Sequence, residues 1–182
     1  MLVSDPPLKI RFIPKSAAVG TRRADKVLHV AYEEPRLESF VNEDLQPSTI
    51  LAGAGLLVPD DGAASAVIEA GLPASVVRDF AAACGVTLAE LGWIVGTSER
   101  TMSRKLAKRA GLEPAESDRA YRLFDVVARA VHAFGDVDKA RRWLQRVLPS
   151  LGSQKPIRLL RTEIGTRQVL SALDRIEFGG IA

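Results

Sequence analysis

Residues 87–111 read TLAELGWIVGTSERTMSRKLAKRAG, and this stretch predicts two short helices joined by a tight turn. Thr87 and Glu90 have the spacing of a capping box. In this motif the threonine hydroxyl accepts a hydrogen bond from an otherwise unpaired backbone amide, and the glutamate side chain accepts one from the amide of the cap residue. Gly96 follows the apolar stripe of this first helix and is expected to end it. Two short helices joined by a glycine-containing turn are the sequence form of a helix-turn-helix.

The second helix of this pair is expected to follow a cap at Thr97-Ser98 and to run from Glu99 to Ala110, with Gly111 ending it. Met102 and Leu106 lie four residues apart, so both can face the helices that come before. The other sides of the helix carry arginine, lysine, serine and threonine. A polar and basic outer face is therefore predicted for it.

The formal net charge of +3 is unevenly distributed along the chain. Residues 98–111 carry five basic and one acidic side chain, and residues 139–175 carry nine and two, whereas the remainder is net acidic. We expect two separate electrostatic contacts. A short basic helix face is often only a solvated surface. When the basic helix follows another helix and a tight turn, however, DNA binding is the favoured interpretation, because these side chains can bond bases and phosphates. The candidate DNA-binding residues are Ser98, Arg100, Thr101, Ser103, Arg104, Lys105 and Lys108.

Four more helices are expected around this pair, because apolar residues recur at helical spacing between capping and breaking residues. They are predicted from Pro73 to Gly85, from Pro114 to Phe134, after Asp136 to Pro149, and from Thr162 to Gly179-Gly180, with a short turn at 155–160. Their apolar faces are Val76, Val77, Phe80 and Cys84; Leu123, Phe124, Val127 and Val131; Ala140, Trp143, Leu144 and Val147; and Val169, Leu173 and Ile176.

Residues 1–62 contain six prolines and no sustained helical period, so no long helix is expected there. Short strands at 9–13 and 27–30 are one interpretation, and a partly disordered arm is the other. The predicted fold is all-α with three parts. These are an irregular N-terminal extension over 1–65, a helix-turn-helix with a long scaffold helix over 66–135, and a small helical domain over 136–182.

Several function classes are disfavoured by composition. One cysteine, Cys84, and two histidines, His29 and His132, cannot complete a four-ligand zinc site, so no metal or cofactor is expected. Cys84 is expected in the core, and His132 is expected to help cap the end of the long helix. No glycine-rich phosphate loop or nucleophile with an evident base is present, which argues against an enzyme. Without an apolar run of roughly 20 residues or a leader pattern, we expect a soluble, cytoplasmic protein.

A series of short motifs follows in order along the second half of the chain. They are Ser117-Asp118-Arg119 with Arg122; Ala140-Arg141-Arg142-Trp143-Leu144; Leu151-Gly152; Lys155-Pro156 with Leu159-Leu160 and Thr162; and Gly165, Val169, Leu173, Arg175-Ile176-Glu177 and Gly179. Together they resemble the Xre/MbcA/ParS antitoxin family, of the RES-Xre type, over about residues 72–182. The resemblance implies a type II antitoxin that represses its own operon and holds a RES-domain toxin inactive. Such toxins resemble ADP-ribosyltransferases and consume NAD.

The resemblance also implies where the toxin binds, because the C-terminal end of such antitoxins approaches the NAD pocket of the toxin. The candidate toxin-binding residues are Arg161, Thr162, Arg167, Arg175, Glu177, Gly179 and Gly180. Helix-turn-helix proteins usually pair to read two half-sites, so we expect a homodimer on operator DNA and a hetero-oligomer with the toxin. A free-standing repressor without a toxin is the alternative.

Overall fold

The computed structural model describes residues 13–14, 31–32, 46–53, 56 and 60–179. Over these residues the chain is helical, apart from one 3-10 turn and two paired two-residue strands, so the all-α prediction is confirmed. The elements are β1 (Ile13–Pro14), β2 (Ala31–Tyr32), α1 (Pro47–Gly53), α2 (Asp61–Ala70), α3 (Ala74–Ala83), α4 (Leu88–Val95), α5 (Glu99–Ala107), α6 (Pro114–Phe134), α7 (Val137–Gln145), η2 (Pro149–Leu151), α8 (Pro156–Leu159) and α9 (Glu163–Glu177). The predicted strands at 9–13 and 27–30 lie outside the described residues except at Ile13, and β1 pairs with β2 in parallel.

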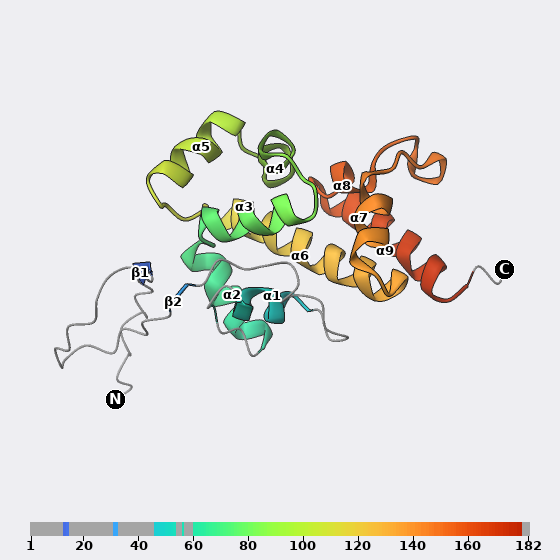
Figure 1. Cartoon of the computed structure of the whole chain (residues 1–182), viewed down its shortest axis with the longest axis horizontal. Coiled ribbons are helices and arrows are strands. Elements are labelled where there is room, and N and C mark those ends of the chain that lie inside the picture. The colour runs from blue at the N-terminus through green and yellow to red at the C-terminus, as the bar shows by residue number, and fades with distance from the viewer. Residues whose placement is uncertain (1–12, 15–30, 33–45, 54–55, 57–59, 180–182) are drawn as a thin grey trace.

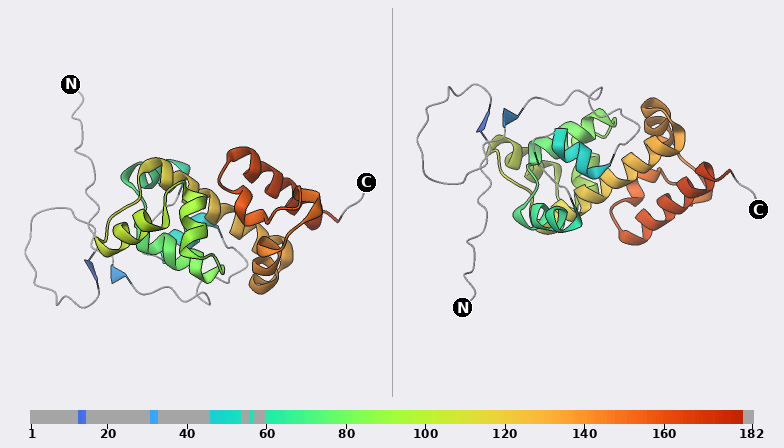
Figure 2. Two further views of the ribbon diagram at one scale, coloured as in Figure 1. Left: turned by 90° about the horizontal axis from the view of Figure 1, so that it is seen from above. Right: turned by 90° about the horizontal axis from the view of Figure 1, so that it is seen from below.

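The long helix α6 lies at the centre of the fold. Its 21 residues span about 31 Å, and its limits are as predicted, with Pro114 in the first turn and Gly135 in a left-handed conformation after the last. The first half of α6 lies beside α2 and α4, and the second half lies beside α7 and α9 (Figures 1 and 2). Leu123 and Phe124 are fully buried in it. Helix α6 thus contributes to the core at both ends of the molecule.

The predicted helix-turn-helix is present in α4 and α5, with α3 packed against both. Thr87 and Glu90 form the expected capping box, and Gly96 adopts the left-handed conformation (φ 83°) that ends α4. Met102 of α5 is fully buried, as its spacing predicted. Phe80 of α3 meets Phe124 of α6 edge to face, with ring centroids 4.6 Å apart, which fixes this unit on the scaffold helix.

Helix α5 is shorter than predicted, because it ends at Ala107 rather than Ala110. Arg109 adopts a left-handed conformation (φ 50°), and the amide of Ala110 bonds back to the Lys105 carbonyl at 2.9 Å. Ala110 then accepts a hydrogen bond from the amide of Ala74. This backbone pairing draws the end of α5 toward the start of α3, so the tertiary contact ends the helix before Gly111.

Helices α1 and α2 were not predicted. Asp60 caps α2 by accepting a hydrogen bond from the Ala63 amide, and Ala64 and Val67 form its buried stripe. This stripe is too short and too alanine-rich to stand out beside the prolines that precede it. Helix α1 has only seven residues, and its fully buried Leu51 is held by α6, a partner far away in the sequence.

The C-terminal helices agree with the prediction except at two apolar positions. Val147 lies beyond the end of α7 and is 53% exposed, and Ile176 is 38% exposed, so neither continues a buried stripe as expected. Trp143 packs against the core beside Phe134, with ring centroids 5.7 Å apart. Helix α9 packs against α6 and α8 through fully buried Val169 and its neighbours.

Cys84 and His132, which the composition singled out, lie in the core and in the last turn of α6. Cys84 is buried as predicted, and the desolvation of its thiol raises its pKa to about 12 despite the nearby positive charge of Arg141. His132 lies in the last turn of α6, where it was expected, and its Nε2 also lies 3.2 Å from Glu177 Oε1 on α9. Among the described residues no helix is long and apolar enough to cross a membrane.

Candidate functional site

The exposed face of α5 carries most of the residues predicted to bind DNA. Arg100, Ser103, Arg104 and Lys108 are exposed, and among the described residues none of them has an ion-pair partner. A recognition helix needs such a face, with cations and hydroxyls free to bond bases and phosphates.

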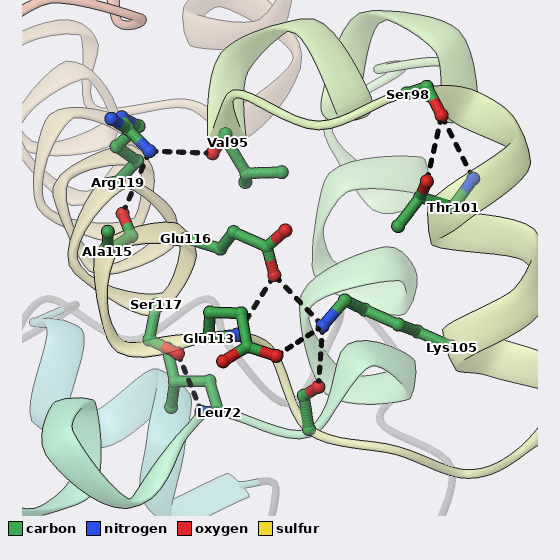
Figure 3. Close-up of polar contacts among 11 residues, drawn as sticks. Leu72, Val95, Ser98, Thr101, Lys105, Glu113, Ala115, Glu116, Ser117 and Arg119 are labelled. Carbon is green, nitrogen blue, oxygen red and sulfur yellow. Dashed lines mark hydrogen bonds and ion pairs between the residues drawn. The ribbon is translucent and has the colours of Figure 1, made fainter.

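Ser98 and Thr101 are tied to one another at the start of α5. The Ser98 hydroxyl accepts a hydrogen bond from the Thr101 amide at 3.1 Å and donates one to Thr101 Oγ1 at 3.0 Å (Figure 3). Ser98 is therefore the N-cap of α5, as the sequence indicated. Both side chains position the first turn of the helix.

Lys105 forms ion pairs within the protein, unlike Lys108, the other lysine predicted to bind DNA from this helix. Its Nζ lies 3.2 Å from a carboxylate oxygen of Glu113 and 3.2 Å from one of Glu116, and it donates a hydrogen bond to the Gly111 carbonyl (Figure 3). Its side chain is only 13% exposed. These contacts connect α5 to the start of α6. Lys105 therefore has a structural role, which could not be seen from the distribution of charge along the sequence.

The turn before α5 is held from α6 by Arg119. Its Nη1 donates to the Val95 carbonyl at 3.0 Å and to the Ala115 carbonyl at 3.2 Å (Figure 3). A Cβ on Gly96 would lie 2.9 Å from that same nitrogen, so a side chain there would displace the guanidinium. The Ser117 hydroxyl, from the same stretch of α6, accepts a buried hydrogen bond from the Leu72 amide at 2.9 Å. The Ser117-Asp118-Arg119 motif therefore fixes the helix-turn-helix on the scaffold helix.

A second candidate surface lies at the C-terminal end of the molecule. A groove of about 530 Å³ runs between the loop around η2 and the outer face of α9. Arg167 and Arg175 line it together with Ile164, whose side chain is 65% exposed. The rest of the wall is formed by four polar side chains, by two leucines and by a glycine, namely Ser150, Gln154, Gln168, Ser171, Leu151, Leu159 and Gly152. The groove is therefore basic, with a mixed polar and apolar wall and one exposed apolar side chain, Ile164.

The residues predicted to bind the toxin do not share one face. Arg167 and Arg175 line the groove, whereas Glu177 lines a smaller cavity together with His132. Thr162 is the N-cap of α9, because its hydroxyl accepts a hydrogen bond from the Gly165 amide at 3.0 Å. Gly179 follows the end of α9 (φ 59°), and Gly180 lies outside the described residues.

Arg161 lies elsewhere, against the helix-turn-helix. Its guanidinium carbon is 4.0 Å from the ring centroid of Trp93 on α4, and that of Arg158 is 5.4 Å from the same centroid. Trp93 and Arg158 were missed in the sequence, since 65 residues separate them and no local pattern joins α4 to α8. We call Trp93, Arg158 and Arg161 the Trp93 cluster.

A helix-turn-helix on a long scaffold helix, followed by a helical module with a basic groove, defines a two-part helix-turn-helix class of protein. Family models match both parts. Residues 63–125 match the antitoxin Xre-like helix-turn-helix domain, and residues 129–179 match the antitoxin Xre/MbcA/ParS C-terminal toxin-binding domain. Among the described residues, no group of three or more side chains is placed to hold a metal ion.

The chain is also similar in sequence to proteins named Antitoxin Xre. The one from Photorhabdus laumondii is 32% identical over 116 residues, which are 63% of this chain and 78% of the relative. The one from Yersinia enterocolitica is 30% identical over 113 residues, or 62% and 76% of the two chains. The chain therefore belongs to the Xre antitoxin family. A chain of the M. tuberculosis MbcT-MbcA toxin-antitoxin complex is also similar, with 28% identity, a TM-score of 0.45 and coverage of 60% of this chain and 96% of that one.

Proposed function

We propose that this chain is the antitoxin of a toxin–antitoxin pair, which inactivates a RES-type toxin through its C-terminal module and represses its own operon through α5. The observation that carries the proposal is the basic groove lined by Arg167 and Arg175, because it lies within the segment that matches a toxin-binding domain. The toxin-binding module would cover residues 136–182, and the DNA-binding part would cover residues 66–135.

The groove has properties that suit an acidic protein partner. Arg175 has no ion-pair partner among the described residues, and Arg167 has only a long contact of 3.9 Å with Glu163. Positive charge speeds the encounter with an acidic surface, and an exposed apolar side chain such as Ile164 supplies a buried anchor once the partner is bound. The end of α9 at Glu177, together with Gly179 and Gly180 after it, would then approach the NAD pocket of the toxin and keep substrate out. In this proposal the chain acts by inhibition and catalyses no reaction.

The free cations and hydroxyl of α5 suit operator DNA. Arg100 and Arg104 would contact base edges, and Lys108 would contact phosphate. One short helix covers only a few base pairs, so a homodimer that places two copies of α5 one helical turn apart is proposed for the DNA complex. Both activities belong in the cytoplasm.

The test is co-expression of the full chain with the product of the adjacent gene, with measurement of growth, cellular NAD and co-purification. We expect the neighbour alone to stop growth and deplete NAD, and the chain to restore both. The double variant Arg167→Glu/Arg175→Glu should lose protection and capture, while Arg142→Glu, an exposed arginine of α7 outside the groove, should keep them. If the neighbour neither binds nor harms the cell, the chain is a free-standing repressor instead.

A further inference from the structure

We propose that the Trp93 cluster is a second DNA contact, at which Arg158 and Arg161 bind the phosphate backbone beside the site read by α5. The inference rests on DNA binding by α5 and extends the DNA-contacting surface from the helix-turn-helix into the C-terminal module. It also removes Arg161 from the toxin-binding residues that the family resemblance implied.

Cation–π contacts with Trp93 hold the side chains of Arg158 and Arg161 in place before any ligand binds. Both guanidinium carbons lie within about 6 Å of the indole centroid, the range of a cation–π contact, at 4.0 Å for Arg161 and 5.4 Å for Arg158. Trp93 is 43% exposed, and both arginines are exposed. Because the indole restricts the arginine side chains before DNA arrives, less conformational entropy is lost on binding.

The hydrogen-bond donors of these arginines are unused. In the part of the chain that the structure describes, neither guanidinium has a hydrogen bond or an ion pair, in contrast to Arg119. The acidic residue of α4, Glu90, is occupied by its capping box and by Lys155 at 3.8 Å. A guanidinium that is held by a cation–π contact alone keeps its N–H donors available for phosphate oxygens.

The position of the cluster suits a flanking phosphate contact. Trp93 lies in the last turn of α4, next to Gly92, and a Cβ on Gly92 would be 3.1–3.2 Å from the backbone of residues 97–99. Helix α4, which carries the indole, therefore packs closely against the turn that leads into α5. Figure 1 shows α4 between α5 and α8, and α4 contacts both. Since the first helix of such a motif crosses the DNA backbone, arginines along its outer side meet the strand beside the major groove.

The chemistry favours a phosphate backbone over the toxin as the partner. A DNA strand offers a regular row of anions that arginine binds without reading sequence. Neither Arg158 nor Arg161 lines the groove that contains Arg167 and Arg175. The two basic surfaces are thus separate, and each can be removed without changing the other.

The test measures fluorescence anisotropy of the full chain with a labelled duplex of about 30 base pairs from upstream of its gene, long enough for two half-sites, across a range of salt concentrations. Because each phosphate contact contributes about 0.9 to the slope of log affinity against log salt, Arg158→Ala/Arg161→Ala should lower that slope by about two for each protomer, or about four for the homodimer, and weaken binding at 0.1 M salt by roughly tenfold or more. Arg142→Ala is the matched control and should change neither value. Arg100→Ala/Arg104→Ala reports separately on α5.

A second pair of variants tests Trp93 as the positioning residue of the cluster. Trp93→Ala removes no charge, so affinity should fall several-fold while the salt slope stays close to that of the unaltered chain. Trp93→Phe keeps an aromatic face and should restore most of the affinity. Thermal unfolding of each variant checks that the exposed substitutions leave the fold intact.

Three results would overturn the inference. An unchanged affinity and slope for Arg158→Ala/Arg161→Ala, with weakened binding by Arg100→Ala/Arg104→Ala, would refute the Trp93 cluster and leave the proposed function standing. Loss of toxin capture by Arg158→Ala/Arg161→Ala with unchanged DNA binding would assign the cluster to the toxin. If the unaltered chain binds no DNA at all, the inference and the proposed operon repression both fall.

Discussion

Lys105 and Arg119 show how charged side chains in this molecule serve the fold. The ammonium of Lys105 lies between Glu113 and Glu116, and the guanidinium of Arg119 closes the carbonyl end of α4. A partly buried cation with fixed acceptors has few donors left for a ligand. Charge counted along a sequence therefore overestimates the surface available to DNA, and burial decides which cations remain free.

Cys84 gives a prediction at this scale. Burial raises the pKa of its thiol to about 12, so at pH 8 only about one thiol in ten thousand is ionised in the folded chain. We expect alkylation by iodoacetamide at pH 8 to proceed far more slowly in the native protein than in 6 M guanidinium chloride, as followed by mass spectrometry. Equal rates in the two conditions would contradict the buried, protonated thiol.

Gly165 gives a second prediction, because its lack of a side chain permits the contact between α8 and α9. A Cβ there would lie 2.1 Å from the Leu159 carbonyl oxygen, which is backbone and cannot move aside easily. We expect Gly165→Ala to lower the free energy of unfolding by about 1–3 kcal/mol, as overpacking does, in a urea titration. Ser171→Ala, on the exposed face of the same helix, should stay within about 0.5 kcal/mol of the unaltered chain.

At the scale of elements, α6 holds the helix-turn-helix through a few polar contacts that bridge distant parts of the sequence. Ser117 accepts from the Leu72 amide, 45 residues earlier, and the bond is buried. Ser117→Ala would leave that amide without a partner, so we expect a loss of about 1–3 kcal/mol in unfolding free energy. Ser103→Ala, on the exposed side of α5, is the control and should be close to neutral. A neutral Ser117→Ala variant would show that another acceptor replaces the hydroxyl.

Helix starts could be predicted from the sequence, whereas contacts between distant elements could not. Caps lie within four residues of the groups they bind, so Thr87, Ser98, Asp136 and Thr162 could each be placed at a helix start. Contacts across 45 or 65 residues, such as Ser117 with Leu72 or Arg158 with Trp93, leave no local pattern. Helix α5 ended early because a tertiary partner determined its end, whereas α2 was overlooked because its buried stripe is short and rich in alanine.

The candidate sites were predictable to different extents. The exposed face of α5 followed from helical spacing, since Met102 fixes the buried side and the basic residues must then face outward. The residues expected to bind the toxin were carried over from the family motifs and are divided among different faces of the module. Only Arg167 and Arg175 come together in the groove, because a shared face depends on how η2 packs beside α9.

At the scale of the whole molecule, α1 belongs to the core although it precedes the matched domains. Leu51 and Leu56 are buried, and each buried leucine contributes about 1.5–3 kcal/mol. A chain that starts at residue 60, and so keeps the Asp60 cap of α2, should therefore unfold at a clearly lower temperature than one that starts at residue 46, as measured by circular dichroism. Leu51→Ala in the full chain should cost about 2–5 kcal/mol, and Ser65→Ala, exposed on α2, should not. Equal melting temperatures for the two truncated chains would show that α1 is dispensable.

The position of α6 in both halves of the core has a consequence for how such proteins can recombine. The boundary between the two parts is a helix face and not a linker, since α4 packs against one end of α6 while α7 and α9 pack against the other. A hybrid of two relatives joined at Gly135 would pack the α7 and α9 of one relative against the α6 side chains of the other, to which they are not fitted. A join before Glu113 would in turn separate α6 from the α2 and α4 against which it packs, so hybrids joined at either end of α6 should be less stable than the unaltered chains.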